Sequence, residues 1–163
     1  MTLLIVWWSL TGGSEQLARA AFEGALEQVE RDDVALLRAD RAGPEEMLAA
    51  RATLFVCPEN LATMAGMMKD FFDRCYYPVL GRIEGRPYAT IVCAGSDGEG
   101  ATRQIDRIAL GWRMRRVADP IIVCTHAQTP EEILAPKQIE EPELARAREL
   151  GASLAAGASM GLW

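Results

Sequence analysis

Residues 3–14 read Leu3-Leu4-Ile5-Val6-Trp7-Trp8-Ser9-Leu10-Thr11-Gly12-Gly13-Ser14, and the rest of the chain can be inferred outward from them. The apolar run at 3–8 is too short for a buried helix and rich in branched and aromatic residues, which is typical of a strand covered on both faces. The loop at 9–14 supplies three hydroxyls and two glycines, and a helical pattern follows it. This order binds phosphate, because glycines allow close backbone approach and a helix N-terminus presents unpaired N–H groups.

The spacing separates this loop from two better-known phosphate loops. It has no Lys, which a Walker loop requires, and no Gly-x-Gly-x-x-Gly pattern. Hydroxyls without a cation suit a single terminal phosphate monoester. The alternative is an ordinary turn in which Ser14 is the N-cap of the helix.

The composition predicts one domain, residues 1–163, long enough to bury a core. No apolar run is long enough to span a membrane, and the N-terminus lacks the basic region of a signal peptide. The net charge of −6 argues against nucleic acid as a partner. We therefore expect a cytoplasmic protein with neither membrane nor nucleic acid as a partner.

The chain has four cysteines and one histidine. Cys57, Cys75, Cys93 and Cys124 form no Cys-x-x-Cys pair, so we interpret them as buried apolar residues in a reducing compartment. A zinc site would need tighter spacing and more than His126 alone. We predict no metal site.

Strand and helix patterns alternate along the chain. The predicted strands are Leu3–Trp8, Val34–Leu37, Thr53–Cys57, Tyr88–Cys93 and Ile121–Cys124. The predicted helices run from about Ser14 to Glu30, Gly43 to Arg51, Met64 to Tyr77 with Pro78 as its stop, Ala101 to Arg116 with a basic last turn, and Glu140 to Ala156; Thr125 to Pro136 is read as irregular. This predicts an α/β fold with a five-stranded parallel sheet in the order 2-1-3-4-5, whose ligand binds where the loops after strands one, three and four meet.

Two segments resemble a known family. Ser9-x-Thr11-Gly12-x-Ser14 resembles the phosphate loop of flavodoxin-like FMN proteins. Pro58-Glu59-Asn60, followed by Ala65-Gly66-Met67-Met68-Lys69-Asp70-Phe71-Phe72-Asp73-Arg74, is similar to the segment after strand three in flavodoxin-like NAD(P)H-dependent FMN and quinone reductases. The resemblance implies a flavodoxin-like three-layer sandwich in which the hydroxyls of Ser9, Thr11 and Ser14 contact the FMN phosphate.

The same resemblance implies that two further loops border the flavin ring. They comprise Pro58, Glu59, Asn60, Leu61, Ala62 and Thr63 after strand three, and Ala94, Gly95, Ser96, Asp97 and Gly98 after strand four. Asn60 could bond the ring or cap its turn, and Ser96 and Asp97 could be turn formers only. We favour a solvated loop carboxylate for Glu59.

These two loops contain no aromatic residue, unlike the loops that sandwich the ring in electron-carrier flavodoxins. An unshielded ring leaves room for a nicotinamide or a quinone. The resemblance thus implies a reductase with NAD(P)H as donor, a small-molecule or quinone acceptor, and a homodimer or homotetramer. A flavodoxin-type carrier and a flavin-free regulatory module remain alternatives. His126, past strand five, could contact substrate or be an ordinary surface residue.

Overall fold

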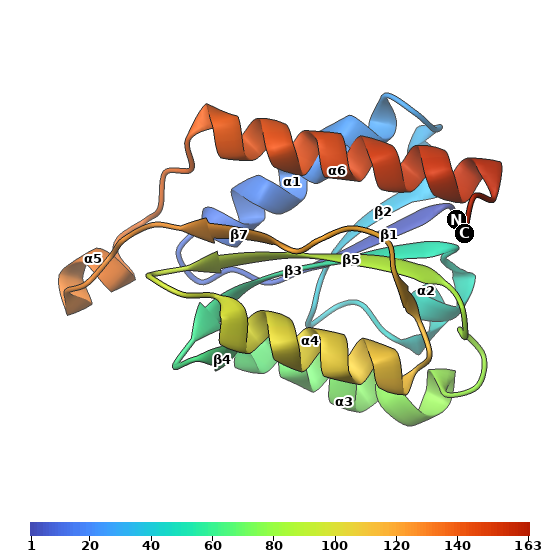
Figure 1. Cartoon of the computed structure of the whole chain (residues 1–163), viewed down its shortest axis with the longest axis horizontal. Helices are drawn as coiled ribbons and strands as arrows, with labels where there is room; N and C mark the ends of the chain where they lie inside the picture. The colour runs from blue at the N-terminus through green and yellow to red at the C-terminus, as the bar shows by residue number, and fades with distance from the viewer.

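The computed structural model describes residues 1–163 and contains a parallel sheet between two layers of helices (Figure 1). Its main strands are β1 (Leu3–Trp7), β2 (Val34–Arg38), β3 (Ala52–Asn60), β5 (Pro87–Ala94) and β7 (Ile121–Cys124). They lie in the order β2-β1-β3-β5, with β7 on the free side of β5 next to the short β6 (Arg115–Arg116). The predicted flavodoxin-like α/β fold and the order 2-1-3-4-5 of its five main strands are confirmed.

Each face of the sheet has its own helices and its own apolar core. Helices α1 (Gly13–Leu26) and α6 (Glu141–Met160) cover one face, and α2 (Pro44–Ala49), α3 (Gly66–Val79) and α4 (Glu99–Gly111) cover the other (Figure 1). The burial pattern explains the apolar runs, because every residue of β1 and β5 is buried. None of the helices is both long and apolar enough to cross a membrane.

Helices α1 and α6 approach one another at two glycines. A Cβ added at Gly24 would lie 2.0 Å from the carbonyl oxygen of Arg148, and one added at Gly151 would lie 1.9 Å from that of Ala21. No side chain fits at either position. Helix α6 is therefore packed closely against α1, the helix that follows the loop at 9–14.

The segment after strand three is not the loop that the sequence predicted. Strand β3 continues through Asn60 and turns back as β4 (Thr63–Met64), with Glu59 opposite Met64 and Asn60 opposite Thr63. The two turn residues have positive φ, 51° at Leu61 and 61° at Ala62. Two positive φ values fit the tight two-residue hairpin turn, which normally uses Asn and Gly. The prediction was wrong here because Leu and Ala give no turn signal.

Several helix ends also differ from the prediction. Helix α1 ends at Leu26, and a 3₁₀ turn at Arg31–Asp33 precedes β2. Pro78 does not stop α3 directly but lies inside its last turn, one residue before the helix ends at Val79, where its missing N–H removes one intrahelical hydrogen bond. Helix α6 begins at Glu141 and continues to Met160, where Gly161 (φ 67°) ends it in the left-handed conformation.

The basic last turn predicted for the helix from Ala101 to Arg116 is not helical. Helix α4 ends at Gly111, Arg113 has φ 57°, and Arg115–Arg116 form β6 beside the start of β5. The interpretation of these arginines as a basic last turn is therefore wrong. Within the segment read as irregular, Pro130–Leu134 form a short helix, α5.

Candidate functional site

The three predicted ligand loops meet at the carboxyl edge of the sheet. Trp7 pairs with Val56 and Pro58 with Cys93, so β1, β3 and β5 end at similar heights. The short helix α5 projects past the same edge, on the left of Figure 1. The structure thus brings together the three segments that the sequence pattern selected.

The loop after β1 has the geometry of an anion site. The N–H of Gly12 donates to Ser9 Oγ at 2.9 Å, and Gly12 takes the left-handed conformation with φ 87° as the N-cap of α1. A Cβ added at Gly13 would lie 2.8 Å from Cys93 Sγ, so only glycine fits. The alternative that Ser14 is the N-cap is wrong, because the helix starts at Gly13.

Ser14 carries the most informative single atom in the loop. The residue is only 1% exposed, and its Oγ has no hydrogen-bond partner in the protein. A buried hydroxyl without a partner costs about 1–3 kcal/mol. A phosphate oxygen at the start of α1 would be the missing partner, so the residues present fit the FMN phosphate. Thr11 is half-buried in the same turn, whereas Leu10 is 70% exposed.

Glu59 is neither a free carboxylate nor a solvated one. Its Oε1 accepts the N–H of Gly98 and its Oε2 that of Ala101, both at 2.9 Å. The carboxylate therefore caps the N-terminus of α4 and ties the hairpin to the loop after β5. The interpretation as a solvated loop carboxylate was wrong. No local signal could reveal it, since the partners lie 39 and 42 positions away.

The hairpin contacts α4 at two further points. The carbonyl oxygen of Ala62 would lie 2.1 Å from a Cβ at Gly100, so only glycine fits there. The N–H of Met64 donates to Gln104 Oε1 at 2.9 Å. The two loops that border the predicted ring site therefore form one connected unit.

The remaining predicted ring residues are mostly turn formers. Asp97 Oδ1 accepts the N–H of Glu99 at 3.4 Å, and the carbonyl of Asn60 accepts Thr63 Oγ1 at 3.0 Å. The side chains of Asn60 and Ser96 are exposed and make no hydrogen bond. Ala94 is buried and its carbonyl accepts the N–H of Thr125 at 2.8 Å. Main-chain groups of Gly95 and its neighbours remain the ones available to a ring.

Two residues of this edge had no signal in the sequence. Gln16 on α1 and Lys137, far along the chain, contact the phosphate loop: the N–H of Lys137 donates to the carbonyl of Thr11 at 2.7 Å. His126, with φ 57°, lines a cavity of about 620 Å³ between β7 and α6 together with Lys137 and Glu143. The structure places His126 beside this segment rather than between the two ring loops.

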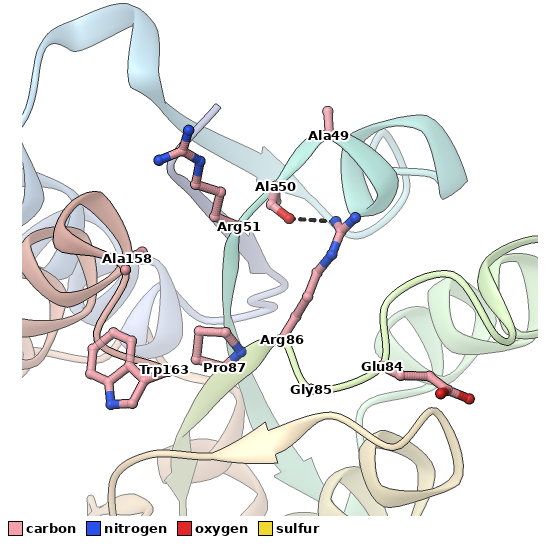
Figure 2. A pocket seen from close by; sticks show the side chains of 10 residues that line it. Ala49, Ala50, Arg51, Glu84, Gly85, Arg86, Pro87, Ala158 and Trp163 are labelled. Carbon is pink, nitrogen blue, oxygen red and sulfur yellow. Dashed lines mark hydrogen bonds between the residues drawn. The ribbon is translucent and has the colours of Figure 1, made fainter.

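A larger cavity, about 690 Å³, lies at the opposite edge of the sheet (Figure 2). Of its two arginines, Arg51 and Arg86, the second already has partners, because the Arg86 guanidinium donates to the carbonyls of Met47, Leu48 and Ala50 at 2.5–3.0 Å. These are the last carbonyls of α2, and Trp163 forms the other wall. The cavity is separate from the predicted ligand loops.

The cysteines do not supply a nucleophile. All four are free, and Cys57, Cys75 and Cys93 are buried. Burial raises the pKa of Cys57 to about 12 and that of Cys93 to about 11, so both thiols stay protonated at neutral pH. No group of three or more His, Cys, Asp or Glu side chains is arranged to hold a metal ion.

Comparisons with known proteins agree with this geometry. A flavodoxin from Aquifex aeolicus (strain VF5) is 31% identical over 98 residues, which are 60% of this chain and 50% of that protein. The chain thus spans about half the length of the curated relative it matches. A flavodoxin from the domain Archaea has a TM-score of 0.76 at 18% identity, covering 98% of this chain and 99% of that chain.

Two further solved structures share the fold. A flavodoxin, WrbA-like protein from Agrobacterium tumefaciens has a TM-score of 0.76 at 17% identity, covering 98% of both chains. The flavodiiron protein from Giardia intestinalis has a TM-score of 0.75 at 16% identity, covering 98% of this chain but 36% of that one. The family model of the NADPH-dependent FMN reductases matches residues 11–129, which is most of the chain and includes the segments 58–63 and 94–98 and the first loop from Thr11 on. The chain therefore belongs to the NADPH-dependent FMN reductase family.

Proposed function

We propose that this protein binds FMN at the carboxyl edge of its sheet and uses it to move electrons from NAD(P)H to a small acceptor such as a quinone. The observation that carries the proposal is the hydroxyl of Ser14, buried without a partner in a loop whose shape suits a phosphate. When bound, FMN supplies the hydride and electron chemistry, and the protein supplies position and environment.

The chain's own residues divide into two groups under this proposal. Ser9, Thr11 and Ser14, with the N–H groups that open α1, hold the phosphate. The hairpin at 58–64 and the loop at 94–98 border the ring with main-chain groups. Glu59 does not act on protons there, because both its oxygens accept N–H groups of α4.

Exposed apolar side chains surround this edge. They are Leu10 (70% exposed), Leu61 (97%), Ile133 (50%) and Leu134 (68%). Such a rim suits an apolar acceptor or a second subunit, so we propose a homodimer or homotetramer that covers it. Light scattering on the protein as it elutes from a size-exclusion column would give its mass and so its oligomeric state. The free thiols favour a reducing compartment such as the cytoplasm.

A flavodoxin-type electron carrier is the second candidate. The net charge of −6 and the likeness to a flavodoxin favour it. The absence of aromatic residues from both ring loops favours the reductase.

An absorbance spectrum after loading with FMN and removal of the excess tests the proposal. We expect a retained flavin spectrum that bleaches with NADH or NADPH and recovers with a quinone. Retained flavin that neither nucleotide bleaches would support the carrier. A protein that retains no flavin at any concentration would overturn both.

A further inference from the structure

Apart from Ile133 and Leu134 in the exposed apolar rim, the segment Thr125–Ile139, here named the strap, has no role in the function proposed above. It leaves the end of β7, forms α5 beyond the sheet and returns to the phosphate loop before α6 begins (Figure 1). Its return places Lys137 and Ile139 against residues more than 120 positions earlier. A contact of that range does not arise from chain connectivity.

One side chain joins the strap to the phosphate loop. Gln16 Nε2 donates to the carbonyl of Lys137 at 2.7 Å and to that of Gly12 at 3.1 Å, and its Oε1 accepts the N–H of Ile139 at 3.1 Å. The N–H of Lys137 donates in turn to the carbonyl of Thr11 at 2.7 Å. Three hydrogen bonds therefore hold the strap, one to Thr11 and two to Gln16, and the fourth ties Gln16 to Gly12.

Packing adds to these bonds. A Cβ at Gly13 would lie 3.4 Å from Lys137 Cβ and 3.5 Å from Ile139 Cδ1. Ile139 is 4% exposed. The strap therefore covers the backbone that carries the buried Ser14 hydroxyl.

The charge of Lys137 is directed away from the loop. Its Nζ donates to the carbonyls of Glu132, Ile133 and Ala135, at the C-terminal end of α5. The strap contributes to the phosphate loop through its backbone and through Gln16, not through a cation.

We propose that Gln16 is a positioning residue for the phosphate site: it clamps the strap against Thr11–Ser14 and holds the loop in the shape that accepts a phosphate. The inference rests on the proposed FMN function. Its consequence is reciprocal, because a clamp that favours phosphate binding must itself be stabilised by the bound phosphate. The C-terminal part of the chain then determines how tightly the cofactor is held.

The variant Gln16→Met keeps the size of the side chain and removes its three hydrogen bonds. We expect it to raise the FMN dissociation constant about tenfold and to change that of riboflavin, which lacks the phosphate, less than about twofold. Gln104→Met is the matched control at the ring end, since Gln104 Oε1 also accepts a main-chain N–H. Gln104→Met should raise the dissociation constants of FMN and riboflavin by the same factor. Gln28→Met, on the exposed turn after α1, should change neither.

Hydrogen exchange gives a readout that does not depend on a variant. The amide of Lys137 should exchange more slowly when FMN or inorganic phosphate is added to the native protein, and faster in Gln16→Met. Equal losses of FMN and riboflavin affinity in Gln16→Met, or unchanged FMN affinity, would overturn the proposal. If Gln16→Met does not fold, unchanged exchange at Lys137 on addition of FMN overturns it instead. If the native protein binds no flavin, the proposed function is wrong. Slower exchange of the Lys137 amide in the presence of inorganic phosphate would still support the clamp.

Discussion

The loop after β1 and the hairpin after β3 face the same predicted ligand from neighbouring strands, yet their backbones are built differently. In the loop the one left-handed residue is a glycine, Gly12 with φ 87°. In the hairpin the left-handed residues are Leu61 and Ala62, with φ 51° and 61°. For residues with a side chain this conformation costs about 1–2 kcal/mol each. We call the loop at 9–14 the phosphate end and the hairpin at 58–64 the ring end. The backbone of the phosphate end is relaxed, and that of the ring end is strained.

The difference shows in what holds each segment. The loop is closed locally by Ser9, and from outside its turn it is held by Gln16 and by the N–H of Lys137. The hairpin is held by Glu59, whose carboxylate accepts two N–H groups at the start of α4, and by Gln104 of α4, whose side chain accepts the N–H of Met64. Strained backbone persists only where its surroundings determine it. We therefore expect the ring end to depend on α4 more than the phosphate end depends on the strap.

The largest expected effect is a pH-dependent loss of stability, to which a buried thiol near each of the two ends contributes. Cys57 lies in β3 below the hairpin and Cys93 below Gly13, and burial raises their pKa values from 9.0 to about 12 and about 11. Above pH 9 the unfolded chain loses these thiol protons while the folded chain keeps them, so stability falls as the pH rises. The two thiols together should lower the unfolding free energy by about 3 kcal/mol between pH 8 and about pH 10.

Urea unfolding at these pH values measures that loss. Cys57→Ala and Cys93→Ala should each remove about half of this pH-dependent contribution. A pH dependence that only one variant reduces would show that one end opens before the other.

The second effect separates ligand binding from stability. Ser14→Ala removes a buried hydroxyl that has no partner in the protein, so the flavin-free protein should be as stable as the native one, or more stable by up to about 1 kcal/mol. The same change removes a donor to the phosphate and should raise the FMN dissociation constant about 10- to 100-fold. Thermal unfolding and flavin titration give the two values.

Thr90 provides the control for that experiment. Its Oγ1 is also buried without a partner, but in the middle of β5 rather than at the loop. Thr90→Val should raise the stability by a similar amount and leave FMN affinity unchanged. If Ser14→Ala behaves like Thr90→Val in both measurements, Ser14 does not hold phosphate.

The third effect concerns the carboxylate of the ring end. In Glu59→Gln one oxygen becomes an NH₂ group that faces an N–H donor of α4, which should lower the unfolding free energy by about 1–2 kcal/mol. The affinities for FMN and riboflavin should fall together, because the ring loops move rather than the phosphate loop. Calorimetry and flavin titration test both statements.

Glu46→Gln is the matched control, since Glu46 Oε2 accepts the N–H of Gly43 at 2.9 Å at the start of α2. Because the amide oxygen of the new side chain can still accept that N–H, this variant should cost less stability than Glu59→Gln, and it should change no flavin affinity. Equal flavin affinities in the two variants would show that the hairpin does not need its link to α4.

The same contrast explains how much could be read from the sequence. Residues 9–14 act through their own turn and the adjacent strand and helix, so composition and spacing predicted the loop, the strand order and the edge where the three loops meet. The hairpin escaped because its turn uses Leu61 and Ala62, which carry no turn signal. The roles of Glu59 and Gln16 were not predicted, because their partners lie between 39 and 123 positions away in the sequence. The one exception is Gly12, which is close to Gln16. Local chemistry was readable, and long-range hydrogen bonds were not.

The smallest expected effect tests the strain itself. Leu61 is 97% exposed, so its replacement loses no packing, and Asn tolerates the left-handed conformation better than Leu. Leu61→Asn should raise the unfolding free energy by about 0.5–1 kcal/mol, as measured by urea unfolding. Leu10→Asn should not raise it, because Leu10, which is 70% exposed, lies in the loop after β1 and has no left-handed backbone. A gain in both variants would mean that removing exposed apolar surface is responsible, and the two ends would then not differ in strain.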